Sequence, residues 1–169
     1  PVTTVSIAIL VLAIVFAIKT LKIVPQQHAW VVERLGKFDR ILMPGLNIIV
    51  PFIDRVAYKH ELKEFPLDVP SQVCITRYNT QLQVDGVLYF QVTDPMRATY
   101  EISNYLQAIE QLTVTTLRNV VGSMDLEQTL TSRDQINGQL RGVLDQATGR
   151  WGIRVNSVEL KSIDPPASI

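Results

Sequence analysis

The first two dozen residues constrain this chain more than any other part of its sequence. Residues 2–18 carry no charge, and residues 5–18 include ten large aliphatic or aromatic side chains. Each such side chain favours transfer into a bilayer by roughly 0.3 to 0.6 kcal/mol, and a helix over residues 2–18 covers about 26 Å of a hydrocarbon core about 30 Å thick. We therefore predict a transmembrane anchor over residues 1–24, with its helix ended by Pro25.

Six side chains of this anchor are predicted to contact the membrane. Four of them are apolar. The other two are lysines, which can place their ammonium groups among the lipid headgroups while their methylene stems stay in the apolar layer. The six are Ile7, Leu10, Ile14, Phe16, Lys19 and Lys22.

A cleavable signal peptide is the alternative to an anchor. Such a peptide has a basic segment before its apolar run and a small-residue cleavage site after it, and residues 1–24 contain neither. All the nearby cations follow the apolar span, so the positive-inside rule predicts that the body of the chain lies on the cytoplasmic side. We expect a single-pass protein of the plasma (inner) membrane. These cations are Lys19, Lys22, Arg34, Lys37 and Arg40.

The neutral overall composition hides a basic region beside the anchor. The formal net charge is +0, yet residues 1–60 contain seven Lys or Arg and only three Asp or Glu. Such a region favours a surface of anionic lipid. Nucleic-acid binding is excluded, because the remaining cations are scattered and form no basic face with elements that could read bases.

The few cysteine and histidine residues argue against a disulfide-stabilised scaffold, and they leave a zinc site only if carboxylates supply further ligands. Cys74 has no second cysteine with which to form a disulfide, and it reads as a small residue of a strand. His28 and His60 are the only histidines, too few for a zinc site built from His and Cys. We predict no metal, no cofactor and no small-molecule substrate.

The segment "LMPGLNIIVPFIDRV" (residues 42–56) is apolar and interrupted by prolines. Pro44 and Gly45 predict a turn. A buried core strand is the favoured interpretation of the apolar residues that follow, which are Leu46, Ile48, Ile49, Val50, Phe52 and Ile53. The alternative is that part of this segment dips into the bilayer interface. On that alternative, the predicted membrane contacts are Leu46, Ile49 and Phe52.

The segment "VDGVLYFQVTDP" (residues 84–95) belongs to a strand with one apolar and one polar face. Apolar and polar residues alternate over residues 81–92, and Pro95 ends the pattern. Two strands are predicted before it, over residues 58–69 and 73–76, separated by prolines. The hydrophilic residues 76–80 then form a hairpin connection.

The hydrophobic period then changes from two residues to three or four. Asn104, followed by Gln107, predicts the start of an amphipathic helix, and Ser132, followed by Gln135, predicts a second one.

A final strand covers residues 153–163, where the alternation slips between Val155 and Val158. Either a bulge or burial of both faces explains the slip. Asp164 is then a candidate N-cap for a further helix that begins over residues 165–169.

Four blocks of the sequence together resemble the stomatin/prohibitin/flotillin (SPFH, band 7) superfamily, and most closely its stomatin-like or paraslipin branch. Their order and spacing carry the resemblance, which covers nearly everything after residue 23. The blocks are "IVPQQHAWVVERLGKFDRILMPGLNIIVPFIDRV" (23–56), "VDGVLYFQVTDPMRATY" (84–100), "QLTVTTLRNVVGSMDLEQTLTSRDQIN" (111–137) and "WGIRVNSVELKSIDPP" (151–166).

The resemblance implies an α+β fold in which the transmembrane helix precedes a domain of two α+β subdomains. The first, over residues 25–95, rests on or partly in the membrane, and the second, over residues 96–164, contains the two helices. A long C-terminal coiled-coil helix follows in the family. The resemblance also implies assembly into large rings or cages that enclose a membrane patch, with a membrane protease of the AAA class or a small membrane protein as partner.

The sequence contains no recognisable catalytic constellation. No Gly-x-Ser-x-Gly elbow or phosphate-binding loop occurs, and the two histidines lie in or beside strand-like segments. Asp125, Glu127 and Asp134 lie near predicted helix starts, as capping residues do. A non-enzymatic scaffold is therefore favoured over a membrane-anchored hydrolase and over a monomeric lipid-binding module.

Charges of both signs on the second helix are candidates for contacts between subunits. An exposed ion pair contributes only about 0 to 1 kcal/mol, so a ring has to repeat many such contacts. The candidate residues are Arg133, Asp134, Arg141, Asp145 and Arg150.

Overall fold

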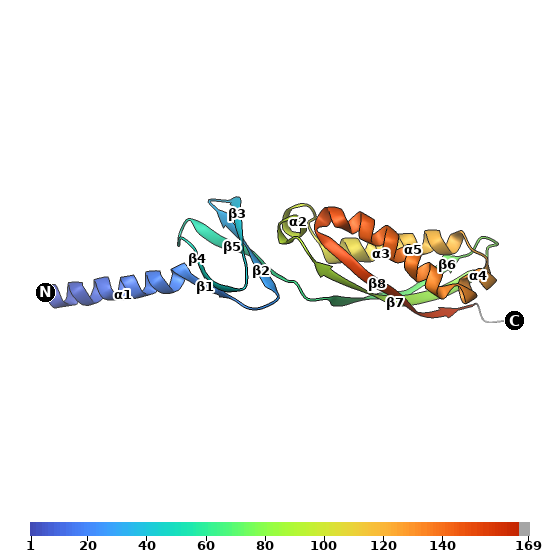
Figure 1. Ribbon diagram of the computed structural model, residues 1–169, viewed down its shortest axis with the longest axis horizontal. Coiled ribbons are helices and arrows are strands. Elements are labelled where there is room, and N and C mark those ends of the chain that lie inside the picture. Colours follow the sequence, from blue (N-terminus) through green and yellow to red (C-terminus); the bar gives the residue numbers. More distant parts are fainter. Residues whose placement is uncertain (166–169) are drawn as a thin grey trace. The chain divides into compact units, whose positions relative to one another are not determined.

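The structure of the chain is a computed structural model that describes residues 1–165. The helix predicted over residues 165–169 therefore lies, after Pro165, outside the described residues. The chain divides into two compact units, with the division between Lys63 and Glu64 (Figure 1). This point precedes the subdomain boundary expected after residue 95, because strand β7 (Gln81–Val92) pairs with strands on both sides of it in the second unit.

The N-terminal helix α1 spans Val2–Thr20 and has no buried residue. Leu21 is already extended, with φ −89° and ψ 129°, so the helix ends before Pro25, where the sequence predicted its end. The chain leaves the helix early because residues 21–24 form a strand with a distant partner. The backbone N–H of Ile49 also donates to the carbonyl oxygen of Thr20 at 2.8 Å, which satisfies a helix-end acceptor.

The first unit contains two small antiparallel sheets. One is a two-stranded ribbon, and the other has the strand order β3-β2-β5. The hydrophobic core of the first unit is formed by Val24, Val32, Leu42 and Ile49, with Trp30 and Val56 packed against them. The ribbon strands are β1 (Leu21–Val24) and β4 (Gly45–Ile48), and the others are β2 (His28–Arg34), β3 (Lys37–Leu42) and β5 (Asp54–Glu61).

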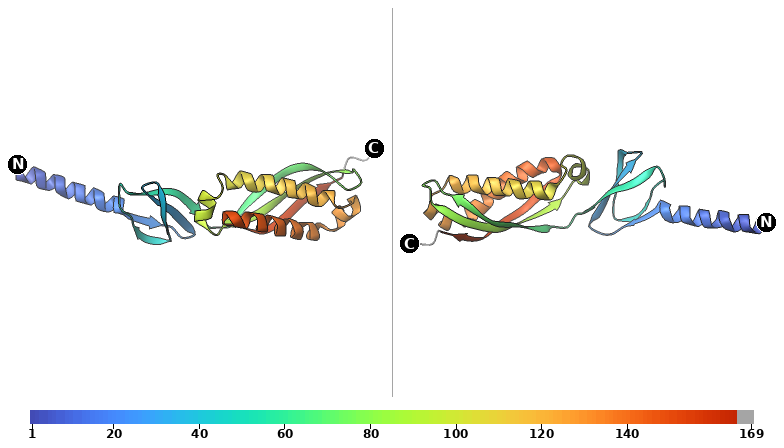
Figure 2. Two further views of the ribbon diagram at one scale, coloured as in Figure 1. Left: turned by 90° about the horizontal axis from the view of Figure 1, so that it is seen from above. Right: turned by 180° about the vertical axis from the view of Figure 1, so that it is seen from behind.

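The second unit is a three-stranded antiparallel sheet of order β6-β7-β8, with helices packed on one of its faces (Figure 2). The outer strands are β6 (Phe65–Ile75) and β8 (Ile153–Asp164). The alternation predicted for residues 81–92 is confirmed, because every apolar-face position of β7 is buried. The prediction of two separate strands divided by prolines was wrong, because the single strand β6 contains both Pro66 and Pro70. The strand tolerates them since it lies at the sheet edge and its register shifts between Val69 and Gln72.

The helices of this unit begin where their caps predict. Asn104 accepts a hydrogen bond from the Gln107 N–H at 3.3 Å, and Asp125 and Gln128 form a reciprocal capping box. Ser132 is the N-cap residue of the second long helix, as predicted. The helices are α2 (Pro95–Tyr100), α3 (Tyr105–Gly122), α4 (Leu126–Thr131) and α5 (Arg133–Thr148), followed by a 3₁₀ turn over Gly149–Trp151.

The phase slip in the last strand is a bulge. Tyr89 pairs with Ser157 and Phe90 pairs with Val155, so Asn156 has no opposite residue in β7. The extra residue lets Val155 and Val158 both point into the core, where both are buried.

Gly152 offers a test of how tightly the turn before β8 packs against the end of β7. Its φ is +70°, its carbonyl accepts from the N–H groups of Thr93 and Asp94, and a Cβ there would overlap the Asp94 carbonyl oxygen. We expect Gly152→Ala to lower the free energy of unfolding by roughly 2 to 3 kcal/mol, through left-handed strain and this overlap. Urea unfolding in detergent micelles, followed by circular dichroism, measures the change.

Gly142→Ala is the matched control. Gly142 lies in α5 with nothing within 4 Å of its would-be Cβ, so alanine should stabilise the helix by up to about 1 kcal/mol. Equal unfolding midpoints for the two variants would contradict the role given to Gly152.

Candidate membrane interface

Helix α1 exposes apolar side chains in every direction. It is the one helix of residues 1–165 that is long and apolar enough to cross a membrane, with a mean hydropathy of 2.5 and none of its span buried within the protein. All four apolar residues of α1 that were predicted to contact lipid are exposed. They are Ile7, Leu10, Ile14 and Phe16. No described part of the chain covers this surface, which therefore needs an apolar environment from elsewhere.

The β1–β4 ribbon continues the exposed apolar surface. Ile23 lies opposite Leu46 in the register, and Leu21 lies opposite Ile48, so these four side chains share one face of the ribbon. Ile23 is 73% exposed and Leu46 is 67% exposed, whereas Val24 on the other face is buried in the core. We call Leu21, Ile23, Leu46 and Ile48 the apolar ribbon face. It inverts the usual pattern, in which the exposed face of a ribbon is polar.

A buried core strand is therefore the wrong interpretation of the apolar residues 46–53. Most of them are exposed, including Phe52 at 88%. Ile49 is the exception, because it is 4% exposed and packs in the core of the first unit. Its side chain is thus inaccessible to lipid, and we remove Ile49 from the residues predicted to contact the membrane.

The loop between β4 and β5, residues 49–53, holds Phe52 in an unfavourable conformation. The φ of Phe52 is +74°, a left-handed value that costs an aromatic residue roughly 1 to 3 kcal/mol. Two hydrogen bonds impose the turn: the Asp54 N–H donates to the Val50 carbonyl at 2.8 Å, and the Val50 N–H donates to the Asp54 carboxylate at 2.9 Å. Asp54 therefore fixes the loop that presents Phe52.

The Asp54 carboxylate is the centre of a charged cluster. Its side chain is 0% exposed, and it accepts from Arg34 at 2.7 Å and 3.2 Å and lies 3.5 Å from Arg40. Arg40 also donates to the Ile48 carbonyl at 2.7 Å, which links the cluster to the ribbon. The Arg34 hydrogen bond, the Val50 N–H and the charge of Arg40 hold the pKa of Asp54 far below its usual range, against the effect of burial.

Sequence reasoning missed Asp54 and the strand β1. Asp54 is the only acidic residue between Asp39 and Glu61, within a basic and apolar stretch, and that isolation was an available signal. The assignment of residues 21–24 to a helix hid the ribbon, since a strand of this length is recognisable only through its partner.

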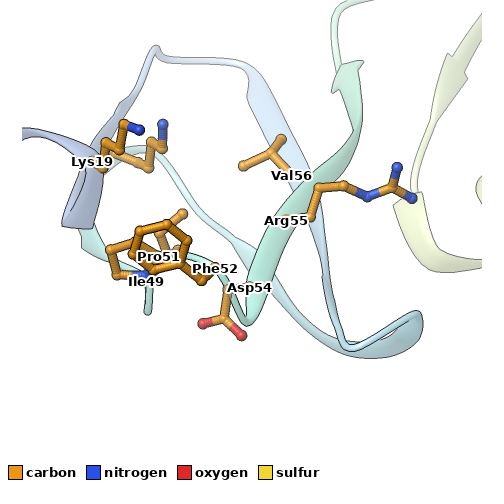
Figure 3. Close-up of a pocket in the computed structure, with 8 residues that line it drawn as sticks. Lys19, Ile49, Pro51, Phe52, Asp54, Arg55 and Val56 are labelled. Atoms are coloured by element: carbon orange, nitrogen blue, oxygen red, sulfur yellow. The ribbon is translucent and has the colours of Figure 1, made fainter. Parts of the chain in front are cut away.

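An open pocket of about 340 Å³ lies between the end of α1 and the 49–53 loop. Figure 3 shows Ile49, Pro51 and Phe52 grouped on one side and Lys19 on another, with the carboxylate of Asp54 directed away from Lys19. The remaining lining residues are Lys22, Arg55 and Val56.

The charged residues proposed for subunit contacts differ in their accessibility. Arg141 donates to the Asn156 carbonyl at 2.9 Å, and Asp145 accepts from the Val155 N–H at 3.1 Å, so both attach α5 to β8. Arg133, Asp134 and Arg150 are exposed. Arg141 is exposed as well, whereas Asp145 is partly buried.

Two residues of types that often act in catalysis, His60 and Cys74, are buried within the protein. His60 is buried, its ring stacks on Tyr58 and burial lowers its pKa. Cys74 is buried as well, and burial raises the pKa of its thiol, which disfavours the reactive thiolate. Among residues 1–165, no three His, Cys, Asp or Glu side chains are grouped so that they could hold a metal ion.

Comparison with known proteins gives consistent matches. The family model described as "SPFH domain / Band 7 family" matches residues 22–169. An uncharacterized protein of Mycobacterium bovis is 58% identical over 98% of this chain and 44% of its own length, and one of Methanothermobacter thermautotrophicus is 46% identical over 97% of this chain and 51% of its own. The human protein named "Stomatin-like protein 2, mitochondrial" is 43% identical over 86% of this chain and 41% of its own length. The chain thus spans about half the length of these relatives, or slightly less.

Removal of the Asp54 charge tests the cluster. We expect Asp54→Asn to destabilise the first unit by roughly 2 kcal/mol at pH 7, since it weakens hydrogen bonds to two arginines. The pKa of Asp54 is depressed in the folded protein, so its contribution is complete above about pH 4, the unfolded value, and falls as the pH drops below it. Asp54→Asn has no carboxylate to protonate at this position, so the variant should lack this loss of stability in acid.

The measurement is urea unfolding followed by the fluorescence of Trp30, which packs against the core of the first unit. A Trp151→Phe background removes the only other tryptophan. Glu61→Gln is the control, because it removes a surface ion pair with Lys63 and should change stability by less than about 0.5 kcal/mol. An unchanged urea midpoint for Asp54→Asn would contradict the structural role given to the Asp54 carboxylate.

Proposed function

The chain belongs to the SPFH domain / Band 7 family, and from this premise we propose that it is a membrane-anchored scaffold subunit that assembles with copies of itself into large rings or cages. The assembly organises a membrane microdomain and restrains or recruits partner membrane proteins, among them a AAA membrane protease or a small membrane protein. The observation that supports this proposal most is the uncovered apolar surface of α1, a helix long and apolar enough to cross a bilayer.

Two features of the first unit support attachment at more than one point. Helix α1 supplies the span, and the apolar ribbon face together with Phe52 supplies a second apolar surface on the same unit. We propose that Leu46 and Phe52 contact the bilayer interface, with Lys19 and Lys22 at the headgroups. A subunit held in this way has a fixed orientation, which favours repeated side-by-side contacts.

The charges of α5 are the proposed contact surface between neighbouring subunits. Arg133 and Asp134 bring both signs to the exposed start of the helix, and Arg150 follows its end. Each contact is weak, so stability comes from the number of copies and from high local concentration on the membrane. Such a subunit acts through its arrangement and performs no catalysis of its own.

The orientation has a direct test. We propose a plasma (inner) membrane location with the body of the chain in the cytoplasm, because the cations beside the span all follow it. A reporter fused after residue 169 that is active only in the cytoplasm should give a signal. A signal only from a reporter that requires export would reverse the orientation.

The assembly is tested by mass. After gentle detergent extraction, native mass spectrometry and electron microscopy should find a large homomer. A monomer would instead indicate a lipid-binding module. Hydrolysis of a peptide or ester by the purified protein, lost on mutation of His28 or His60, would indicate a hydrolase.

Charge variants of α5 locate the contact. The exchange Arg133→Asp with Asp134→Arg keeps the net charge but reverses its order, and we expect it to shift assembly to about two- to fivefold higher protein concentration. Arg118→Glu, on the exposed surface of α3, is the control and should leave assembly unchanged. The opposite ranking of the two variants would exclude α5 as the contact.

A further inference from the structure

The pocket at the end of α1 combines free positive charge with an apolar wall. Lys19 and Lys22 contribute the charge, and within residues 1–165 neither forms an ion pair with an acidic side chain. The acidic member of the lining, Asp54, is already held by Arg34 and Arg40 and is 0% exposed. Arg55 donates to Glu33 at 2.8 Å, so its charge is largely compensated. The pocket therefore carries two uncompensated ammonium groups.

The apolar wall of the pocket is built by the strained loop. Ile49 and Pro51 are buried at its base, and Phe52 extends from it with most of its ring exposed (Figure 3). Asp54 fixes this shape through its two hydrogen bonds to Val50. A ligand that suits such a pocket has an anionic group for the lysines and hydrocarbon for the phenylalanine.

The pocket also lies at a defined depth relative to the span. Lys19 is in the last turn of α1, and a helix of 19 residues is about 28 Å long, close to a hydrocarbon core of about 30 Å. If α1 spans the bilayer, Lys19 is at the level of the lipid phosphates.

We propose that this pocket binds the headgroup of an anionic phospholipid. The phosphate accepts hydrogen bonds from the ammonium groups of Lys19 and Lys22, and the glycerol and first acyl carbons pack against Phe52. A free phosphate ion offers a similar anionic group but leaves the apolar wall without a partner, so the lipid is the better ligand. The inference rests on the proposed membrane anchorage, since only an inserted α1 brings the pocket to the headgroups.

Lipid titration tests the site on the intact chain. The protein in nonionic detergent micelles is titrated with phosphatidylglycerol or with phosphatidylcholine, and native mass spectrometry counts the lipids bound per subunit. We expect a preference for phosphatidylglycerol of roughly tenfold or more, and a loss of roughly fivefold for each of Lys19→Gln and Lys22→Gln. Phe52→Ala should also weaken the binding of phosphatidylglycerol, although it changes no charge.

A matched control separates the pocket from general attraction to positive charge. The double variant Lys37→Gln/Lys59→Gln removes two exposed cations of the same unit that do not line the pocket. It should keep the preference within about twofold of the original protein. Equal losses for this variant and for Lys19→Gln/Lys22→Gln would overturn the proposed site, as would unaltered binding of phosphatidylglycerol by Phe52→Ala.

Two further measurements identify the source of failure. Inorganic phosphate at the lipid's concentration should not displace phosphatidylglycerol, and displacement would assign the pocket to a soluble anion instead. Alkaline carbonate washing of membranes should leave the original protein and all variants in the membrane fraction. Release of the original protein would refute the anchorage itself, whereas retention with no effect of the lysine variants would refute only the lipid site.

Discussion

The buried carboxylate of Asp54 is the interaction on which the first unit depends. It joins residues from β2, β3 and the loop before β5, and it also fixes the conformation of Phe52. An ion with no exposed surface is costly unless it is fully hydrogen-bonded, and here two guanidinium groups and a backbone N–H supply the partners. A small unit with a core of few side chains is thereby given one defined shape.

That defined shape matters because the unit exposes what proteins usually bury. The ribbon directs Val24 inward and Leu21, Ile23, Leu46 and Ile48 outward, so its outer face is as apolar as its inner one. In water such a surface promotes non-specific association. An exposed apolar surface of this kind is consistent with membership in a family of membrane-associated scaffolds.

Patterns with local causes could be predicted from the sequence, and those that depend on distant partners could not. The alternation of β7 and the caps at Asn104 and Asp125 were confirmed because each follows from neighbouring residues. The end of α1 was misplaced because β1 forms only when β4, more than twenty residues later, pairs with it. Residues 46–53 were favoured as core because hydrophobicity alone does not show whether an apolar side chain is buried or exposed in the folded chain. Asp54 was missed because its importance lies in arginines from other strands.

Strand β6 carries Pro66 and Pro70 at the edge of its sheet, and both prolines lack an N–H. The opposite edge strand, β8, is irregular as well, with register shifts near Asn156 and Lys161. Regular edges invite open-ended backbone pairing between molecules, a hazard that grows when many copies are crowded in two dimensions. Among the described residues, neither edge strand of this sheet therefore offers a regular ladder with which another chain could pair.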